Sequence, residues 1–150
     1  MTQSTSKNRD QDEALSAYVK LMRAAGSITH RVHGNLAEEK LSVSQFGVLE
    51  ALYHLGPVCQ RDLARKILKS SGNLTMVVRN LEQRKLVKRT RSSDDRRYYQ
   101  IQLTTAGRDL IERLFPAHAS RIADEFKLLD QSELEALQRI CRKLGLQVEG

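Results

Sequence analysis

The 150-residue sequence predicts a mainly helical fold with a small β-hairpin, an α+β arrangement in which strands are the minor part. Three observations predict it. Apolar residues recur at helical spacing over most of the chain, and this spacing gives way to strict alternation only between about residues 86 and 103. Capping signals mark helix starts at Ser42 and Asp130. The hydrophobic fraction of 40% suffices for a compact core.

The N-terminal segment 1–11 is polar, and we expect a flexible tail there rather than a secretory signal. From residue 15 to residue 36, apolar side chains keep the 3.6-residue period of a helix. This pattern predicts a long amphipathic helix from about Asp12 to Glu39. No apolar run in the chain approaches the ~20 residues that cross a bilayer, so we expect no membrane association and cytoplasmic residence.

A second helix is marked by a capping box, because Ser42 and Gln45 can each satisfy a backbone amide of the other. Gly56, followed by a proline, ends this helix. The segment 58–59 is long enough only for a short edge strand. Residues 60–68 predict a short third helix, and the serine-rich segment after it predicts a tight turn.

A fourth helix is predicted from about Ser71 to Lys85, with one apolar and one polar face. On a helical wheel the apolar side chains point inward, and these are Leu74, Val77, Val78 and Leu81. The opposite side carries few charges for a surface helix; its residues are Gly72, Met76, Arg79 and Gln83, flanked by Thr75 and Asn80. The sequence therefore predicts an outward face rich in hydrogen-bonding groups.

The alternating segment predicts a hairpin of two strands, one over 86–91 and one over 98–103. The residues between them, beginning Ser92-Ser93-Asp94-Asp95, have turn chemistry. The tip of the hairpin therefore holds two acidic residues followed by Arg96 and Arg97.

Two further helices complete the chain. The fifth begins near Thr104, and the sixth begins at the capping box of Asp130 and Glu133 and closes at Gly145. The helices over 12–40 and 105–146 carry apolar faces that a small domain could not cover alone, so we expect them to form a homodimer. Residues 41–104 form the remaining domain.

Positive charge is concentrated in one internal block. Residues 60–100 contain 12 Lys or Arg and four Asp or Glu, a net charge of +8, whereas the rest of the chain carries 13 basic and 14 acidic residues. The block covers the helix pair and the hairpin, which favours a polyanion as partner. A solvated basic face is the alternative that composition alone leaves open.

This order of helix, turn, helix and hairpin is that of a winged helix-turn-helix, which places one helix in the major groove of duplex DNA and the hairpin tip at the minor groove. Arg97 or Arg96 would enter the narrow minor groove, where negative potential is high, and Asp95 would hold an arginine by bidentate pairing. The predicted DNA-binding residues are Gln60, Arg61, Ser70, Ser71, Asn73, Thr75, Met76, Arg79, Asn80, Gln83, Asp95, Arg96 and Arg97.

From about Tyr18 to Leu144 the sequence resembles the MarR family of bacterial regulators. The most specific match is an Asp-x-Arg wing, Asp95 to Arg97, followed by Leu103-Thr104. The other matching segments are Ser42 to Phe46, Leu63-Ala64, Ser71 to Thr75, Leu81-Glu82, Leu86 to Arg89 and Leu103 to Gly107. Residues 114–118 and 70–73 are also similar to members that sense quinones or phenols.

This resemblance implies a dimer that binds palindromic operators, usually as a repressor, with release by a small phenolic or other aromatic ligand or by thiol oxidation. It implies that Arg97 is the minor-groove arginine and Asp95 its structural partner. A ligand would lie between the dimer helices and the winged domain, and the candidate wall residues are Ile28, His30, Val32, Phe46, Tyr53, His54 and Phe115.

Other functions remain open at this point. Cys59 precedes a helix start and has Arg61 nearby, which favours a reactive thiol, although redox members of the family carry their cysteine in the first helix. Exposed aromatic residues on the hairpin, Tyr98 or Tyr99, would favour RNA or protein contact instead. No Gly-rich phosphate loop or catalytic triad is evident, so we expect no enzyme. His30 and His33 lack partners for a metal site, and we expect no metal and no cofactor.

Overall fold

The computed structural model describes residues 2–67, 71–92, 94–95 and 97–145, and it describes no side chains for residues 2–5 and 71–72. The chain divides into two compact units, one formed by 1–34 with 121–150 and the other by 35–120. The first contains the terminal helices, and the second contains the predicted helix-turn-helix and hairpin.

The terminal unit contains α1 (Thr2–Val32), the last residues of α5 (Thr105–Phe126) and α6 (Gln131–Gly145). The predicted capping box of α6 is confirmed, since the Glu133 amide donates to Asp130 Oδ1 at 2.9 Å and the Asp130 amide donates to Glu133 Oε1 at 3.1 Å. Arg31 on α1 and Glu125 on α5 form an ion pair of 2.7 Å, which ties these two helices together.

The bounds of α1 differ from those predicted. The helix begins at Thr2 rather than near Asp12, and it ends at Val32 rather than near Glu39. The segment 2–11 has no apolar stripe to signal a helix, but adding turns to an existing helix costs less than nucleating one. At the other end, Gly34 and Asn35 are poor helix formers, and residues 33–40 form turns instead.

These turns are held in place by arginines from other elements of the central unit. Arg84 donates to the carbonyls of Lys40 at 2.8 Å and Glu39 at 3.1 Å. Arg113 on α5 pairs with the Glu39 carboxylate at 2.8 Å and thereby lowers the pKa of Glu39 below its ordinary value. Lys40 adopts a left-handed backbone conformation with φ of 55°, and the Leu41 amide then donates back to the Leu36 carbonyl.

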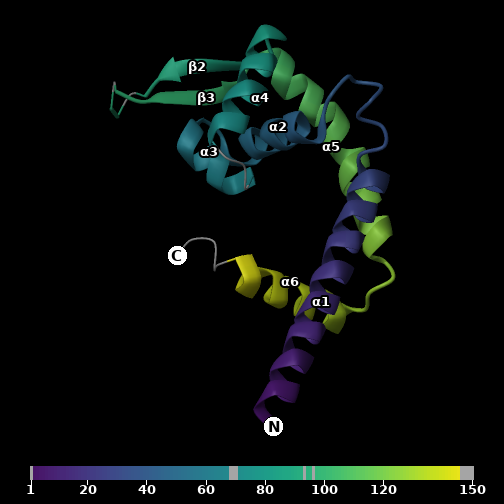
Figure 1. The fold of residues 1–150 in the computed structure, drawn as a ribbon. Coiled ribbons are helices and arrows are strands. Elements are labelled where there is room, and N and C mark those ends of the chain that lie inside the picture. The colour runs from purple at the N-terminus through teal and green to yellow at the C-terminus, as the bar shows by residue number, and fades with distance from the viewer. Residues whose placement is uncertain (1, 68–70, 93, 96, 146–150) are drawn as a thin grey trace. The chain divides into compact units, whose positions relative to one another are not determined.

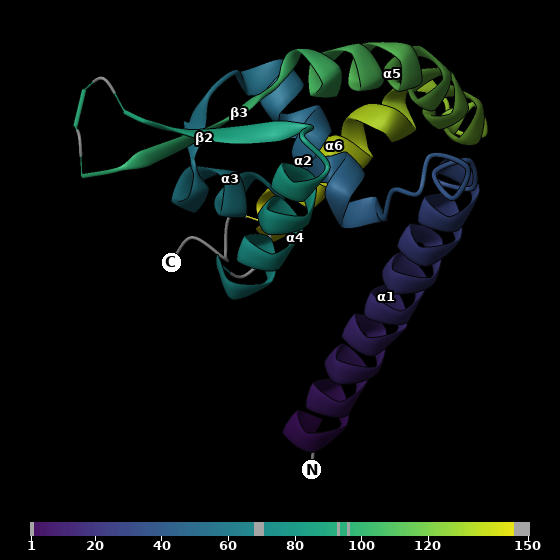
Figure 2. The same cartoon turned by 90° about the horizontal axis from the view of Figure 1, so that it is seen from above.

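The central unit follows the predicted order of elements. It contains α2 (Val43–Leu55), β1 (Val58–Cys59), α3 (Gln60–Ile67), α4 (Ser71–Gln83), β2 (Val87–Arg91) and β3 (Tyr99–Leu103). The capping box at Ser42 and Gln45 is present, and Gly56 ends α2 with φ of 77°, which favours glycine. The three strands pair antiparallel in the order β1-β3-β2. In both views the connected end of the β2–β3 hairpin projects beyond α2, α3 and α4 (Figure 1 and Figure 2).

The core of the central unit gathers side chains from every helix and from the hairpin. Phe46, Leu49 and Leu52 of α2 pack against Leu63 of α3 and Ile111 of α5, each with at most 1% of its surface exposed. The same cluster is completed by Leu36, Leu41, Val48, Ala64, Leu74, Val78, Leu81, Leu86, Val87 and Ile101. Continuous packing of this kind fixes the directions of the helices that carry the polar face.

The start of α5 is fixed to the start of the hairpin by close backbone contacts. Thr104 donates its hydroxyl to the Lys85 carbonyl at 2.6 Å and accepts from the Gly107 amide at 3.1 Å, while its own amide donates to the Leu86 carbonyl. Gly107 is buried so near Leu86 that a Cβ there would overlap the Leu86 carbonyl oxygen. This close approach explains why the segment Leu103 to Gly107 requires glycine at its last position.

Helix α5 contributes to both units, since its residues up to Ser120 belong to the central unit and those from Arg121 belong to the terminal unit. The segment 105–146, for which dimerisation helices are predicted, includes residues of the central core: Ile111 and His118 of α5 are buried, and Ile111 belongs to the core of the central unit. Within the part of the chain that the structure describes, none of the helices combines the length and hydropathy that a bilayer crossing requires.

The contact at Gly107 yields a prediction for stability. Gly107→Ala should lower the free energy of unfolding by about 1–3 kcal/mol, because the new methyl group has to displace backbone rather than a flexible side chain. Urea denaturation measures this change. Gly47→Ala is the control, because a Cβ at that helical position meets nothing within 4 Å and alanine favours helix. Equal stabilities for Gly107→Ala and the parent would contradict the prediction.

Candidate nucleic-acid interface

Helix α4 has the two faces that the sequence predicts. Leu74, Val78 and Leu81 are fully buried, and Val77 is half-buried. The other side is open to solvent, where Met76 has 60% of its surface exposed. The remaining exposed residues of the helix are Asn73, Arg79, Asn80 and Gln83. The core therefore holds α4 by one edge and leaves its hydrogen-bonding edge outward.

Two of the predicted contact residues bond to each other. Gln60, the first residue of α3, donates its Nε2 to the Thr75 hydroxyl on α4 at 2.7 Å. Both side chains are half-buried, and the bond links the two helices of the helix-turn-helix. Arg61 beside Gln60 is exposed. Ser70 and Arg96, which the sequence also proposes for DNA contact, lie outside the described residues, as does the side chain of Ser71.

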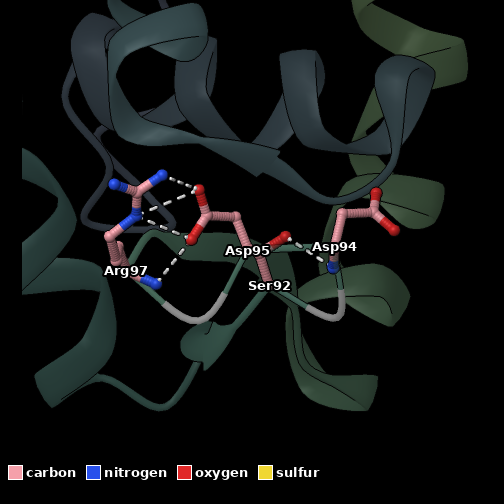
Figure 3. A network of polar contacts seen from close by, with 4 residues as sticks. All are labelled: Ser92, Asp94, Asp95 and Arg97. Carbon is pink, nitrogen blue, oxygen red and sulfur yellow. Dashed lines mark hydrogen bonds and ion pairs between the residues drawn. The ribbon is translucent and has the colours of Figure 1, made fainter.

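The hairpin tip contains the ion pair that the sequence predicts. Arg97 donates Nε and Nη2 to the Asp95 carboxylate at 3.1 and 2.9 Å, and the Arg97 amide donates to Asp95 Oδ1 at 3.0 Å (Figure 3). Nearby, the Ser92 hydroxyl accepts from the Asp94 amide, and the Tyr98 amide donates to the Asp95 carbonyl. The Asp95 carboxylate thus accepts hydrogen bonds from both the backbone amide and the side chain of Arg97.

The electrostatics of this pair favour an ionised carboxylate and an outward guanidinium. The Arg97 side chain keeps the pKa of Asp95 below its ordinary value, assisted by the Arg97 amide. The same bonds raise the pKa of Arg97. The Arg97 side chain is 84% exposed, although Asp95 is only 35% exposed. The carboxylate therefore orients the cation without covering it, and the expected bidentate pairing is confirmed.

A hollow beside the hairpin brings residues that the sequence proposes for function together with three that it does not, Asp62, Arg65 and Arg89. It is lined by Cys59, Gln60, Arg61, Asp62, Arg65, Arg89, Arg97, Tyr98 and Tyr99. Four of these residues are arginines, from α3, β2 and the hairpin tip. The sequence could have placed Arg65 and Arg89 on the surface, Arg65 from its position on a helix and Arg89 from the alternation of its strand. Neither pattern predicts that the two residues line the same hollow.

Arginines also lie against the two exposed tyrosines of the hairpin. The guanidinium of Arg97 is 6.0 Å from the ring centroid of Tyr98, and that of Arg91 is 5.4 Å from the ring centroid of Tyr99. Such cation–π contacts are attractive and contribute about 0.5–1 kcal/mol at exposed sites. The tyrosine rings remain about half exposed, so they are available for stacking.

The predicted ligand-wall residues fall into two groups that belong to different units. Ile28, His30 and Val32 lie on α1 in the terminal unit. In the central unit Phe46 is fully buried with its ring 4.5 Å from that of His118, which is also buried. The other three form an aromatic cluster in which the centroid of His54 lies 5.3 Å from Tyr53 and 4.9 Å from Phe115.

The thiol of Cys59 already has a partner. Its Sγ donates to Asp62 Oδ2 at 3.2 Å, and the residue is half-buried immediately before α3. A thiolate at this position would face a carboxylate, although Arg61 and Arg65 line the same hollow. Cys141, on α6, is exposed in the single chain.

Comparison with known proteins places this geometry in a family. The model described as "MarR family" matches residues 41–99, which span α2, α3, α4 and β2 and reach the first residue of β3. The chain is 34% identical over 135 residues to the HTH-type transcriptional regulator MhqR of Bacillus subtilis, a match that covers 90% of this chain and 93% of that protein.

Solved structures agree on the fold. A structure of BpsR from Bordetella bronchiseptica, described as showing a mechanism for regulation of its DNA binding by 6-hydroxynicotinic acid, superposes with a TM-score of 0.74 at 27% identity over 83% of this chain and 89% of that one. AbsC of Streptomyces coelicolor, a MarR family transcriptional regulator, superposes with a TM-score of 0.83 at 22% identity over 93% and 96% of the two chains.

The helix-turn-helix, the hairpin wing and the identity to a regulator matched over nearly its whole length lead to one conclusion. The chain belongs to the MarR family of winged-helix transcriptional regulators.

Proposed function

We propose that this protein is a homodimeric repressor that binds palindromic operators and is released by a small aromatic ligand. The observation that carries the proposal is the pairing, within one compact unit, of the outward polar edge of α4 with an exposed Arg97 held by Asp95. The excess positive charge of the chain lies in the same segment. Major-groove reading by a helix and minor-groove contact by an arginine account for both features.

In this proposal the contact residues have different tasks. Arg79 pairs with guanine, Asn73, Asn80 or Gln83 pairs with adenine, and Met76 contacts a thymine methyl group. Arg97 enters the minor groove. Arg61 and the helix starts at Gln60 and Ser71 bind phosphates, which supplies affinity but no sequence preference. Gln60 and Thr75 are hydrogen-bonded to each other, so they affect DNA binding mainly by fixing the angle between α3 and α4.

The terminal helices support the proposal of a dimer. Leu15, Tyr18 and Met22 on α1 are more than half exposed in the single chain, and α6 has no buried residue. A second copy of the chain would cover these apolar side chains. A twofold dimer presents two copies of α4, and we therefore expect an inverted repeat whose half-site centres are about 10 base pairs apart.

A decisive experiment combines selection from random duplex DNA with salt titration of the selected site. The proposal predicts one enriched inverted repeat, a steep fall of affinity with salt, and weak competition by unrelated duplex. Binding as a monomer at micromolar concentration, with a footprint over one half-site, would contradict the dimer. Equal affinity for all duplex sequences would contradict the operator.

The aromatic ligand is proposed from the cluster of Tyr53, His54 and Phe115, since aromatic rings bind planar ligands by offset or edge contacts. The related BpsR is regulated by 6-hydroxynicotinic acid, a hydroxylated aromatic acid. We extend this class to phenols and quinones. A thermal-shift screen with these compounds, followed by operator release, tests the proposal; a screen without a stabilising compound would contradict it. Thiol control through Cys59 is less supported, because its thiol donates to Asp62.

A second candidate function rests on Tyr98 and Tyr99, whose rings are 59% and 48% exposed. Exposed aromatic rings beside arginines are typical of surfaces that stack unpaired RNA bases. Competition separates the candidates: a single-stranded RNA that displaces duplex DNA at equal concentration favours RNA contact, whereas its failure favours the operator.

Arg97→Ala should weaken operator binding by about tenfold to a hundredfold, because the substitution removes hydrogen bonds from a charged donor. Fluorescence anisotropy with labelled operator measures the change. Arg9→Ala is the charge-matched control on the N-terminal part of α1 and should bind like the parent. Unchanged affinity of Arg97→Ala would mean that the wing does not contact the operator.

Asp95→Asn should weaken operator binding less than Arg97→Ala does, because the guanidinium remains but loses the carboxylate that orients it. Affinity for unrelated duplex should stay equal or rise, since a negative charge near phosphate disappears. The same anisotropy titrations measure both values. Tighter binding to operator and unrelated duplex alike would show that Asp95 only repels DNA.

Arg79→Ala should relax the base preference at one position of each half-site, at a cost of about 1–3 kcal/mol for the preferred base. Titration against the four single-base variants of that position measures the preference. Gln138→Ala, an exposed substitution on α6, is the control. An unchanged preference profile in Arg79→Ala would remove that residue from the reading face.

A further inference from the structure

A single ion pair joins α4 to strand β2. Glu82 Oε1 accepts from Arg89 Nε at 2.8 Å, with the two side chains 33% and 36% exposed. Glu82 is the one acidic residue in the sequence of α4, where it follows the proposed base-reading residues Arg79 and Asn80. A carboxylate on a helix that approaches DNA is electrostatically unfavourable unless it has another task.

Arg89 lies where two hollows of the surface meet. On one side it lines a hollow with Arg79, Glu82 and Gln83, on the outer side of α4. On the other side it lines the hollow beside the hairpin with Arg61, Arg65 and Arg97. Glu82 accepts from Arg89 through Nε alone, so the Nη donors remain, but the adjacent carboxylate offsets the charge of the guanidinium and weakens any contact that it makes with a phosphate.

The pair contributes little to stability, because exposed ion pairs gain little over water and cost side-chain freedom. Its effect on binding is larger. Any duplex, whatever its sequence, attracts free arginines through its phosphates, and each such contact raises non-specific affinity. A carboxylate that engages one arginine and repels phosphate lowers this non-specific affinity. The loss matters most on unrelated duplex, where no base contacts add to the affinity.

We propose that Glu82 is a specificity-determining residue, whose negative charge weakens non-specific phosphate contact by Arg89 and whose bond to Arg89 links β2 to the base-reading helix α4. The proposal rests on the proposed function as an operator-binding protein. In the operator complex the pair stays closed, and Arg89 serves as a spacer between the groove helix and the wing. On unrelated duplex the closed pair leaves one phosphate without a cation.

The test is a double-mutant cycle with Glu82→Gln, Arg89→Gln and both substitutions together. Affinities are measured for the selected operator and for an unrelated duplex between 50 and 200 mM salt. Glu112→Gln is the matched control, because Glu112 is an exposed acid on α5 that faces an arginine at 4.0 Å. It makes the same change in net charge away from α4 and β2.

We expect Glu82→Gln to bind unrelated duplex about threefold to tenfold more tightly, with a log–log salt slope steeper by about 0.9, as for one added phosphate contact. Operator affinity should change less than twofold, so the specificity ratio falls by the same factor. The added Arg89→Gln should abolish the gain, whereas Arg89→Gln alone should leave non-specific affinity unchanged.

Several results would overturn the inference. The gain could persist in the double variant or appear equally in Glu112→Gln, which would make it an effect of net charge. A changed preference for one base pair in Glu82→Gln would mean that the carboxylate reads a cytosine instead. A specificity ratio that stays constant while the parent binds its operator overturns this inference alone, whereas a parent that binds no duplex overturns the proposed function with it.

A measurement without DNA checks the contact itself. The Nε–Hε proton of Arg89 in the free protein should be protected from exchange in the parent and less protected in Glu82→Gln, because a neutral amide oxygen accepts more weakly than a carboxylate, while Glu112→Gln leaves the protection unchanged. An unprotected resonance in the parent would show that the pair is open in solution, and the inference would fail even if Glu82→Gln alters DNA binding.

Discussion

The burial of one edge of α4 is the constraint on which the interface depends. Leu74, Val78 and Leu81 have no exposed surface, and they enter the same core as Phe46 and Ile111. A helix held by three such side chains cannot rotate about its axis without opening a cavity, which is costly in a close-packed interior. The direction in which the polar edge of α4 faces is therefore fixed by buried hydrophobic residues, which are not themselves on the surface.

The acidic residues of the basic block show how a cationic surface is organised. Both Asp95 and Glu82 accept hydrogen bonds from an arginine, one within the hairpin tip and one between α4 and β2. Asp95 leaves its arginine 84% exposed and directs it outward, whereas the arginine that Glu82 engages is 36% exposed. Arg97 and Arg89 carry the same charge, but their acidic partners leave their side chains exposed to different extents. Affinity and specificity can thus be adjusted separately on one surface.

The sequence predicted the parts of the molecule that depend on local chemistry. The capping box at Ser42 and the two faces of α4 follow from spacings of three and four residues, and the pairing of Asp95 with Arg97 follows from a spacing of two. The start of α1 at Thr2 was missed because a polar helix has no periodic signal. The burial of Phe46 against His118, which was proposed as a ligand wall, depends on contacts between α2 and α5.

The missed interactions at the candidate site join residues from separate elements. Arg89 meets Glu82 across a strand and a helix, and Arg84 caps a turn formed more than 40 residues earlier. Periodicity indicates that such arginines are on the surface, but several acids and carbonyls are equally plausible partners until the elements are packed. For the same reason the hollow that unites Arg61, Arg65 and Arg97 has no signature in the sequence.

Helix α5 is an uninterrupted rod that begins at the root of the hairpin and ends beyond the boundary at Ser120. Its first turn is clamped, because Thr104 bonds to Lys85 and Gly107 abuts Leu86. Pro116 lies just before the boundary and lacks the amide hydrogen that would complete the ladder there. Bending of the α5 axis is therefore expected near Pro116, where the hydrogen bond is missing. The two halves of α5 thus differ in how firmly the backbone is bonded: the first is tied to the hairpin, and the ladder of the second begins with a missing donor.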